Sequence, residues 1–148
     1  MTEDLRISMI QSHIIWEDRE ENLGYYGELL RRVSGRTDLA VLPETFTTGF
    51  SMDVEKQADT MEGQTVPTIK EWAKKYKLAV AGSFIAKDNG KFYNRAFFIT
   101  PEGNSSFAMG VSRILATNPV TRVGSFSRTC CRKAGYCGKD IFSSCQGH

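Results

Sequence analysis

The chain opens with residues that alternate between apolar and polar and continues with apolar residues at helical intervals. Leu5, Ile7 and Met9 are separated by polar side chains, which predicts a strand near the start. Large apolar side chains then recur every three or four residues, as on one face of a helix. The residues of that face are Leu23, Tyr26, Leu30 and Val33. Gly35 closes this helix and the apolar run 39–42 follows, so the pattern predicts a β–α–β unit.

The next part of the chain predicts a second helix and a hairpin. Thr65 is positioned to cap a helix, and Pro67 suits its first turn. The apolar stripe of this helix consists of Ile69, Trp72, Ala73 and Tyr76. We expect strands over 78–85 and 92–99, joined by a turn that contains the favoured Asn-Gly pair. Parallel strands followed by an antiparallel hairpin predict an α/β fold with a mixed sheet.

An acidic residue stands directly after the buried strand 39–42. Pro43 ends the strand because it has no N–H to donate, and Glu44 follows. Open α/β sheets place their chemistry beyond the carboxyl ends of the strands, which makes Glu44 the candidate catalytic residue. Taken alone, a loop carboxylate of this kind is more often solvated or caps a turn. The local pattern therefore needs support from the rest of the chain.

Other candidate residues have ordinary structural interpretations. Gly82 and the pair Tyr93-Asn94 are typical of strand packing and turn formation, and we expect Asn94 to hydrogen-bond local backbone. His13 follows the first strand as a surface residue, and His148 is the last residue. No spacing in the chain pairs either histidine with a nucleophile or a metal ligand.

Composition excludes several classes of function. The chain has 148 residues, 41% of them hydrophobic, and a formal net charge of +2, so nothing demands an acidic partner. No apolar run approaches the roughly 18 residues that cross a bilayer, and a basic, apolar leader is missing, so we expect a cytoplasmic protein without a membrane partner. The four lysines of the second helix predict a solvated face rather than a nucleic-acid site. These are Lys70, Lys74, Lys75 and Lys77.

The pattern changes near residue 105. From about residue 109 the periodicity fades, and we expect residues 109–148 to form an irregular or disordered tail rich in Cys, Arg and Ser. All four cysteines lie there, at Cys130, Cys131, Cys137 and Cys145. They contain no Cys-x-x-Cys pair, so we expect no zinc site among them. The ordered domain is predicted over residues 4–108.

About the first 105 residues resemble one enzyme family. The segment 39–52 around Glu44 is similar to the first signature of the carbon–nitrogen hydrolase (nitrilase) superfamily, ω-amidase branch. Four further stretches extend this resemblance, at 5–11, 16–23, 82–84 and 94–103. The resemblance implies the N-terminal half of an α-β-β-α sandwich and the hydrolysis of the C–N bond in small ω-amides of dicarboxylic or 2-oxo acids. It also implies a homo-oligomer that uses no metal or cofactor.

The family resemblance further implies a Glu–Lys–Cys triad, of which only Glu44 can be placed. Where the family has a basic segment with its lysine, this chain reads Asn-Ser-Ser-Phe-Ala-Met-Gly at 104–110, and no lysine occurs between Lys91 and Lys133. None of the four cysteines stands in the family's nucleophile motif. Because an amide needs both a thiolate and groups that stabilise the oxyanion, we expect this chain to be inactive.

A shift of reading frame, or a gene-fragment boundary, around residues 105–112 is our hypothesis for the aberrant tail. Half of a sandwich leaves strand edges and one sheet face uncovered, so we also expect self-association or a partly molten state. Two alternatives remain open. One is an active amidase that uses Cys130 or Cys131, and the other is a non-enzymatic module that binds nucleic acid or protein through the basic tail.

Overall fold

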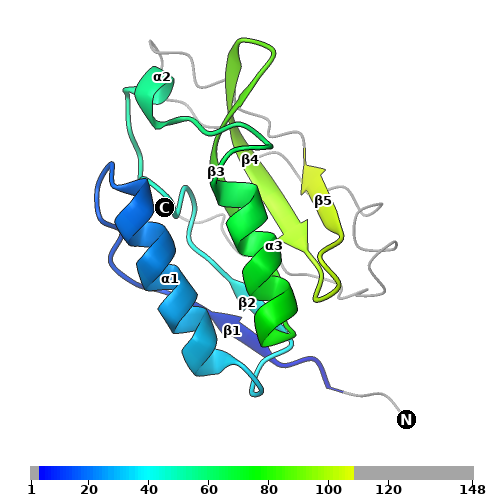
Figure 1. Ribbon diagram of the computed structural model, residues 1–148. Coiled ribbons are helices and arrows are strands. Elements are labelled where there is room, and N and C mark those ends of the chain that lie inside the picture. Colours follow the sequence, from blue (N-terminus) through cyan, green and yellow to red (C-terminus); the bar gives the residue numbers. More distant parts are fainter. Residues whose placement is uncertain (1–3, 109–148) are drawn as a thin grey trace, which may run out of the picture.

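A computed structural model describes residues 4–108 of the chain, and Figure 1 shows their arrangement. Five strands form one sheet: β1 (Ile7–Met9), β2 (Leu39–Val41), β3 (Ala79–Asp88), β4 (Lys91–Ile99) and β5 (Ser105–Ala108). Their order in the sheet is the order along the chain, with β1, β2 and β3 parallel and β3, β4 and β5 antiparallel. The predicted mixed α/β sheet is confirmed. The tail predicted over 109–148, with its cysteines and His148, lies outside the described residues.

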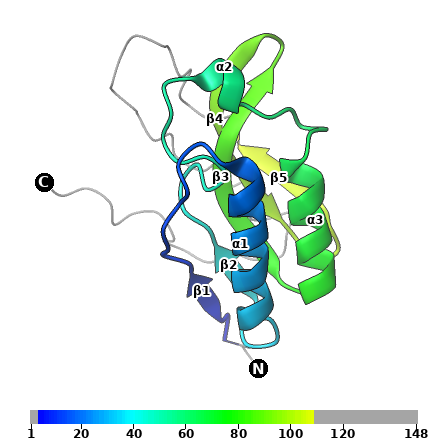
Figure 2. The same cartoon turned by 60° about the vertical axis from the view of Figure 1, so that its left-hand side comes forward.

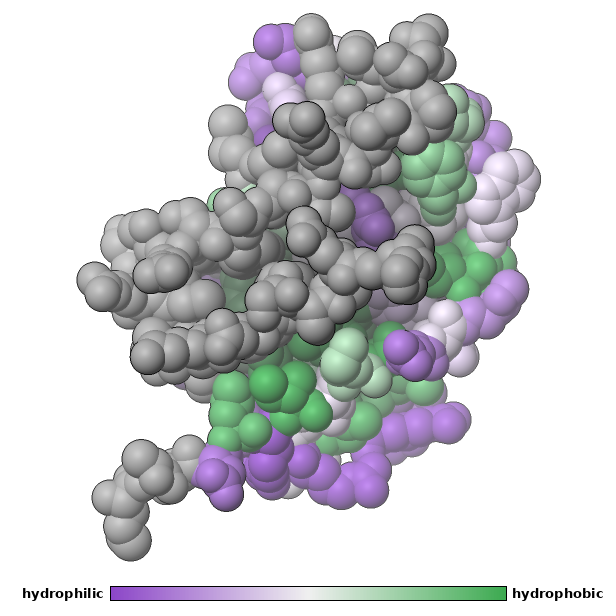
Figure 3. Space-filling view, turned by 180° about the vertical axis from the view of Figure 1, so that it is seen from behind, coloured by the Kyte–Doolittle hydropathy of each residue, from purple (hydrophilic) through white to green (hydrophobic). Residues whose placement is uncertain are grey.

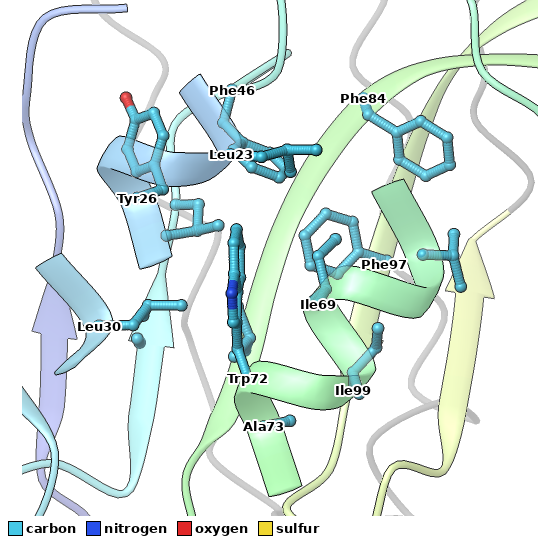
Figure 4. Close-up of a cluster of buried hydrophobic side chains, with 14 of the residues drawn as sticks. Leu23, Tyr26, Leu30, Phe46, Ile69, Trp72, Ala73, Phe84, Phe97 and Ile99 are labelled. Atoms are coloured by element: carbon cyan, nitrogen blue, oxygen red, sulfur yellow. The ribbon is translucent and has the colours of Figure 1, made fainter. Parts of the chain in front are cut away.

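The helices α1 (Arg19–Val33) and α3 (Thr65–Tyr76) cover one face of this sheet (Figures 1 and 2). A short helix α2 (Val54–Gln57) lies near the end of the sheet at which the chain turns from β3 into β4. The predicted apolar faces of the two long helices meet the sheet in a single core (Figure 4). Its largest fully buried side chains include Tyr26, Phe46, Phe84, Phe97 and Leu30. Because each helix buries one stripe, its opposite face carries the charged residues.

Side chains at both ends of α1 complement the helix dipole. Asp18 caps the helix by accepting a hydrogen bond from the backbone N–H of Glu21, and the last turn carries Arg31 and Arg32. Arg31 also makes a bidentate ion pair with Glu28, with distances of 2.7 and 2.6 Å. This hydrogen bonding lowers the pKa of Glu28 to about 2.

The cap of α3 differs from the prediction. Thr65 is the first residue of the helix, and the preceding Gln64 makes no side-chain cap. The buried Asp59 caps the helix instead, because its Oδ2 accepts hydrogen bonds from the backbone N–H of Thr65 at 2.8 Å and from the Thr65 hydroxyl at 2.7 Å. A cap six residues before the helix leaves no local sequence signature.

The hairpin between β3 and β4 turns at the predicted residues. Asn89 and Gly90 form its two-residue loop and both have positive φ angles, of 49° and 72°. This geometry belongs to the type I′ turn that the Asn-Gly pair favours. Beyond it, β4 pairs with a strand that the sequence did not predict, since Ser105–Ala108 is short and lacks a clear alternation.

The face of the sheet opposite the helices carries exposed hydrophobic side chains (Figure 3). Ile7 and Met9 belong to this face, because their neighbour Ser8 is in register with Ala40 of the helix-side core. Ile7 is 43% exposed and Met9 is 73% exposed. The described sheet therefore has one covered face and one face that is still open near β1.

Candidate active site

Glu44 lies immediately beyond the carboxyl end of β2, at the position that the sequence predicted. The backbone N–H of Leu42 still donates to the carbonyl of Ala81 at 2.8 Å, so the ladder continues for one residue after β2. Pro43 then ends it, and the chain turns over residues 44–48. The side chain of Glu44 is exposed. A carboxylate here stands at the end of a parallel strand pair, where α/β proteins build binding sites.

The residue after Glu44 holds an unfavourable backbone conformation. Thr45 has a φ of 47°, a left-handed angle that is a genuine outlier for a β-branched residue. Its backbone N–H donates to the hydroxyl of Ser83 at 3.0 Å, and its carbonyl accepts from the N–H groups of Thr48 and Gly49. These bonds hold the strained turn in place, and such strain is typical of functional sites.

Phe46 anchors the same turn in the core. Its ring is fully buried and meets Tyr26 of α1 edge to face at 5.4 Å and Phe97 of β4 at 6.0 Å between centroids (Figure 4). Edge-to-face pairs of this kind add to the energy of burial. Two residues after the carboxylate, the turn is therefore fixed between a helix and the sheet.

Asn22 of α1 ties the end of the turn to the preceding loop. This fully buried side chain donates to the carbonyls of Ile15, at 2.6 Å, and Thr47, at 2.8 Å, and accepts from the N–H of Ile15. The backbone N–H of Glu17 adds a further bond to the carbonyl of Thr48 at 2.8 Å. The loop before α1 and the turn after Glu44 thus form one rigid unit.

The carboxylate itself is held by a residue from β4. The amide nitrogen Nδ2 of Asn94 donates to Oε1 of Glu44 at 2.5 Å, although the two residues are fifty positions apart. The expectation that Asn94 bonds local backbone is therefore wrong. Sequence reasoning missed this pair because only the register of β4 against β3 brings Asn94 to the end of β2.

A shallow hollow of about 340 Å³ adjoins this site. It is lined by residues 9–12, which leave β1, and by residues 41–43, which lead into Glu44. Its walls are mainly apolar, with Gln11 and Ser12 as the polar side chains. The backbone N–H of Ile10 bonds to the carbonyl of Val41 at 2.9 Å, so the two walls are joined.

Other predicted features stay outside the site or serve packing. His13 is exposed, as predicted, and Gly82 leaves room for the ring of Phe97 and for Leu42, 3.0 and 3.1 Å from where its Cβ would be. Within residues 4–108, no group of histidine, cysteine, aspartate or glutamate side chains could hold a metal ion. In the same part of the chain, no helix is long and apolar enough to span a bilayer.

Comparison with known proteins identifies relatives. The profile of the carbon–nitrogen hydrolase family matches residues 6–144. An omega-amidase, YafV of Yersinia enterocolitica, is 29% identical over 99 residues, which are 67% of this chain and 38% of that protein. The 2-oxoglutaramate amidase of Bacillus subtilis is 30% identical over 99 residues, 66% of this chain and 38% of that protein.

A solved structure shows the same fold. The crystal structure of a CN-hydrolase superfamily protein from Xanthomonas campestris superposes with a TM-score of 0.68 and 39% identity, covering 72% of this chain and 40% of that one. The chain spans about two fifths of the length of the curated amidases quoted above, 38% in each case. The described residues thus correspond to part of a larger amidase-type architecture.

Proposed function

The chain belongs to the carbon–nitrogen hydrolase family, and we propose that Glu44 is the general base of an amide-hydrolysing site. The observation that carries this proposal is the way the protein holds Glu44. Its turn has a strained residue next to the carboxylate, a buried aromatic anchor and a side-chain donor from another strand. A carboxylate that only capped a turn would not need this support.

The chemistry explains why a fixed carboxylate suits this reaction. An amide is a poor electrophile, so its carbonyl is attacked effectively only by an activated nucleophile such as a thiolate. A carboxylate in hydrogen-bond reach of the thiol takes its proton and later returns a proton to the leaving nitrogen. Glu44 is exposed at the end of the strands, where a substrate has access to it.

The proposed substrates are small ω-amides of dicarboxylic or 2-oxo acids. This class is supported by the names of the relatives, among them omega-amidases and a 2-oxoglutaramate amidase. From the family resemblance, we also propose that the protein forms a homo-oligomer.

We further propose that this chain on its own does not turn over amides. Its sequence offers no lysine between Lys91 and Lys133, the region in which the family's lysine is expected. The residues of a catalytic triad act together, so a chain that keeps the glutamate but lacks the lysine and the nucleophilic cysteine should have no partial triad activity. The observed strand β5 occupies residues 105–108 of that region.

Ammonia release from succinamate, a simple ω-amide, tests the proposed inactivity. We expect no release above the uncatalysed rate from the 148-residue chain. Release that disappears in Glu44→Gln would overturn the inactivity and favour the alternative in which a tail cysteine acts as nucleophile. Acylation of Cys130 or Cys131, detected by mass spectrometry, would identify that cysteine.

The encoding DNA tests the hypothesis of a frame shift. If it is correct, another frame downstream of the codon for Gly103 encodes a basic segment with a lysine and then a strand that ends in cysteine. A protein made from the restored frame should release ammonia, and Glu44→Gln should slow that release by roughly 10²–10⁴-fold, the usual contribution of a general base. Equal rates in the two restored proteins would refute the role of Glu44.

A further inference from the structure

The bond between Asn94 and Glu44 has only one chemically allowed orientation. A carboxylate can only accept hydrogen bonds, so the amide nitrogen of Asn94 must face it and the amide oxygen must point elsewhere. Asn94 Nδ2 lies 2.5 Å from Glu44 Oε1. Within residues 4–108, no group donates a hydrogen bond to the other carboxylate oxygen, Oε2. The two oxygens of Glu44 are therefore not equivalent.

The protein bears two local costs at this place. The amide oxygen Oδ1 of Asn94 is buried and has no hydrogen-bond partner in the described part of the chain. Thr45, next to Glu44, keeps its left-handed backbone angle of 47°. Both features are unfavourable for folding, and unsatisfied or strained groups of this kind concentrate where a side chain must be held for function.

Two neighbouring strands of the sheet divide the task of holding Glu44. Ser83 of β3 binds the backbone at Thr45, while Asn94 of β4 binds the carboxylate. Ser83 pairs with Ala96, and Ile85 pairs with Asn94. Because paired and alternate residues share a face, the side chains of Ser83 and Asn94 lie on the same face of the sheet, on neighbouring strands. Side chains on a paired hairpin, whether they donate or accept, are held more rigidly than side chains on a loop.

We propose that Asn94 is a positioning residue for Glu44: it occupies Oε1 and so leaves Oε2 as the oxygen that takes the proton. The inference rests on the proposed role of Glu44 as a base. It adds that a residue fifty positions away selects the reactive oxygen and its direction. Asn94 itself needs no contact with the substrate.

The first experiment follows the side-chain amide of Asn94 by NMR in the 148-residue chain. In the wild type we expect one Nδ2 proton shifted downfield by the charged acceptor and an order parameter of about 0.85. Glu44→Ala should abolish the shift and lower the order parameter below about 0.6. Glu44→Gln keeps an acceptor oxygen but no charge, so it should retain the order and lose most of the shift. An unchanged Asn94 signal in Glu44→Ala would overturn the proposal.

The second experiment replaces Asn94 by leucine, which has a similar size and no polar atoms. Because Asn94→Leu removes the unpartnered oxygen and leaves Glu44 exposed to water, the melting temperature should not fall. The order parameter of the Glu44 side chain should fall below about 0.6. The exposed Asn104 supplies the matched control, since Asn104→Leu should leave Glu44 unchanged.

These outcomes separate the inference from the proposed function. A Glu44 side chain that stays ordered in Asn94→Leu would show that Asn94 is merely structural, and the positioning role would then be wrong even if Glu44 is the base. Conversely, equal ammonia release by the two restored proteins refutes the base without affecting the NMR results. If Asn94→Leu does not fold, the Glu44 variants still decide the question.

Discussion

At the scale of single residues, the turn that carries Glu44 depends on the hydroxyl group of Ser83. The buried Ser83 hydroxyl accepts a hydrogen bond from the backbone N–H of Thr45 at 3.0 Å, and the backbone carbonyl of Ser83 accepts one from the N–H of Phe46 at 3.2 Å. Only the first of these bonds involves the side chain. A hydroxyl that faces a strained residue is the simplest point at which to weaken the site.

We predict that Ser83→Ala destabilises the protein by about 1–3 kcal/mol, because the N–H of Thr45 loses its acceptor in a buried place. Urea unfolding measures this difference. The control is Ser105→Ala on β5, whose hydroxyl has no hydrogen bond within the described residues and which should change stability by less than about 0.5 kcal/mol. Similar losses in the two variants would show that the Thr45 bond contributes nothing specific.

At the scale of elements, the packing of α1 against α3 depends on a glycine. A Cβ atom at Gly27 would lie 3.0 to 3.1 Å from three atoms of the Trp72 indole ring. Trp72 is 8% exposed and stands between Leu30 and Ile69 in the core (Figure 4). The two helices can therefore approach this closely only because position 27 has no side chain.

We predict opposite effects for two glycine substitutions in α1. Gly24→Ala should stabilise the protein by about 0.5–1 kcal/mol, because alanine favours the helix and nothing lies within 4 Å of the added methyl group. Gly27→Ala gains the same propensity but must displace the Trp72 ring, and overpacking costs typically about 1–3 kcal/mol. Thermal unfolding compares them. Equal stabilisation would mean that Trp72 can move without cost.

At the scale of the whole molecule, the sheet has an open face and two edges within residues 4–108. Its edge strands there are β1 and β5, and Met9 of β1 is 73% exposed on the face opposite the helices. Unpaired edges and exposed apolar faces promote association between copies.

We therefore predict that the 148-residue chain self-associates. Met9→Lys should shift the molar mass measured by light scattering toward the monomer, because it places a charge on the open face. Tyr25→Lys on α1 is the control and should leave the mass unchanged, although Tyr25 is also 40% exposed. A monodisperse wild-type monomer with one sharp unfolding transition would contradict this prediction.

Much of the fold followed from periodic patterns along the chain. Patterns of neighbouring residues predicted the β–α–β unit, the helix 65–76 and the Asn-Gly hairpin. Together these elements predicted the mixed sheet. The strand β5 and the short helix α2 were missed because each has only four residues. A segment so short adopts its structure from its neighbours, here from pairing with β4 in the case of β5.

The sequence by itself determined that Glu44 follows a buried strand and that the chain resembles carbon–nitrogen hydrolases, since both depend on adjacent residues. Only the tertiary structure decided how Glu44 is held. Three features depend on the register of the strands and the packing of the loops. They are the left-handed backbone angle of Thr45, the cap that Asp59 provides for α3, and the hydrogen bond from Asn94 to Glu44. Such contacts join residues that are far apart in the sequence, and they form only when the fold closes the loop between them. A local sequence pattern therefore does not predict them.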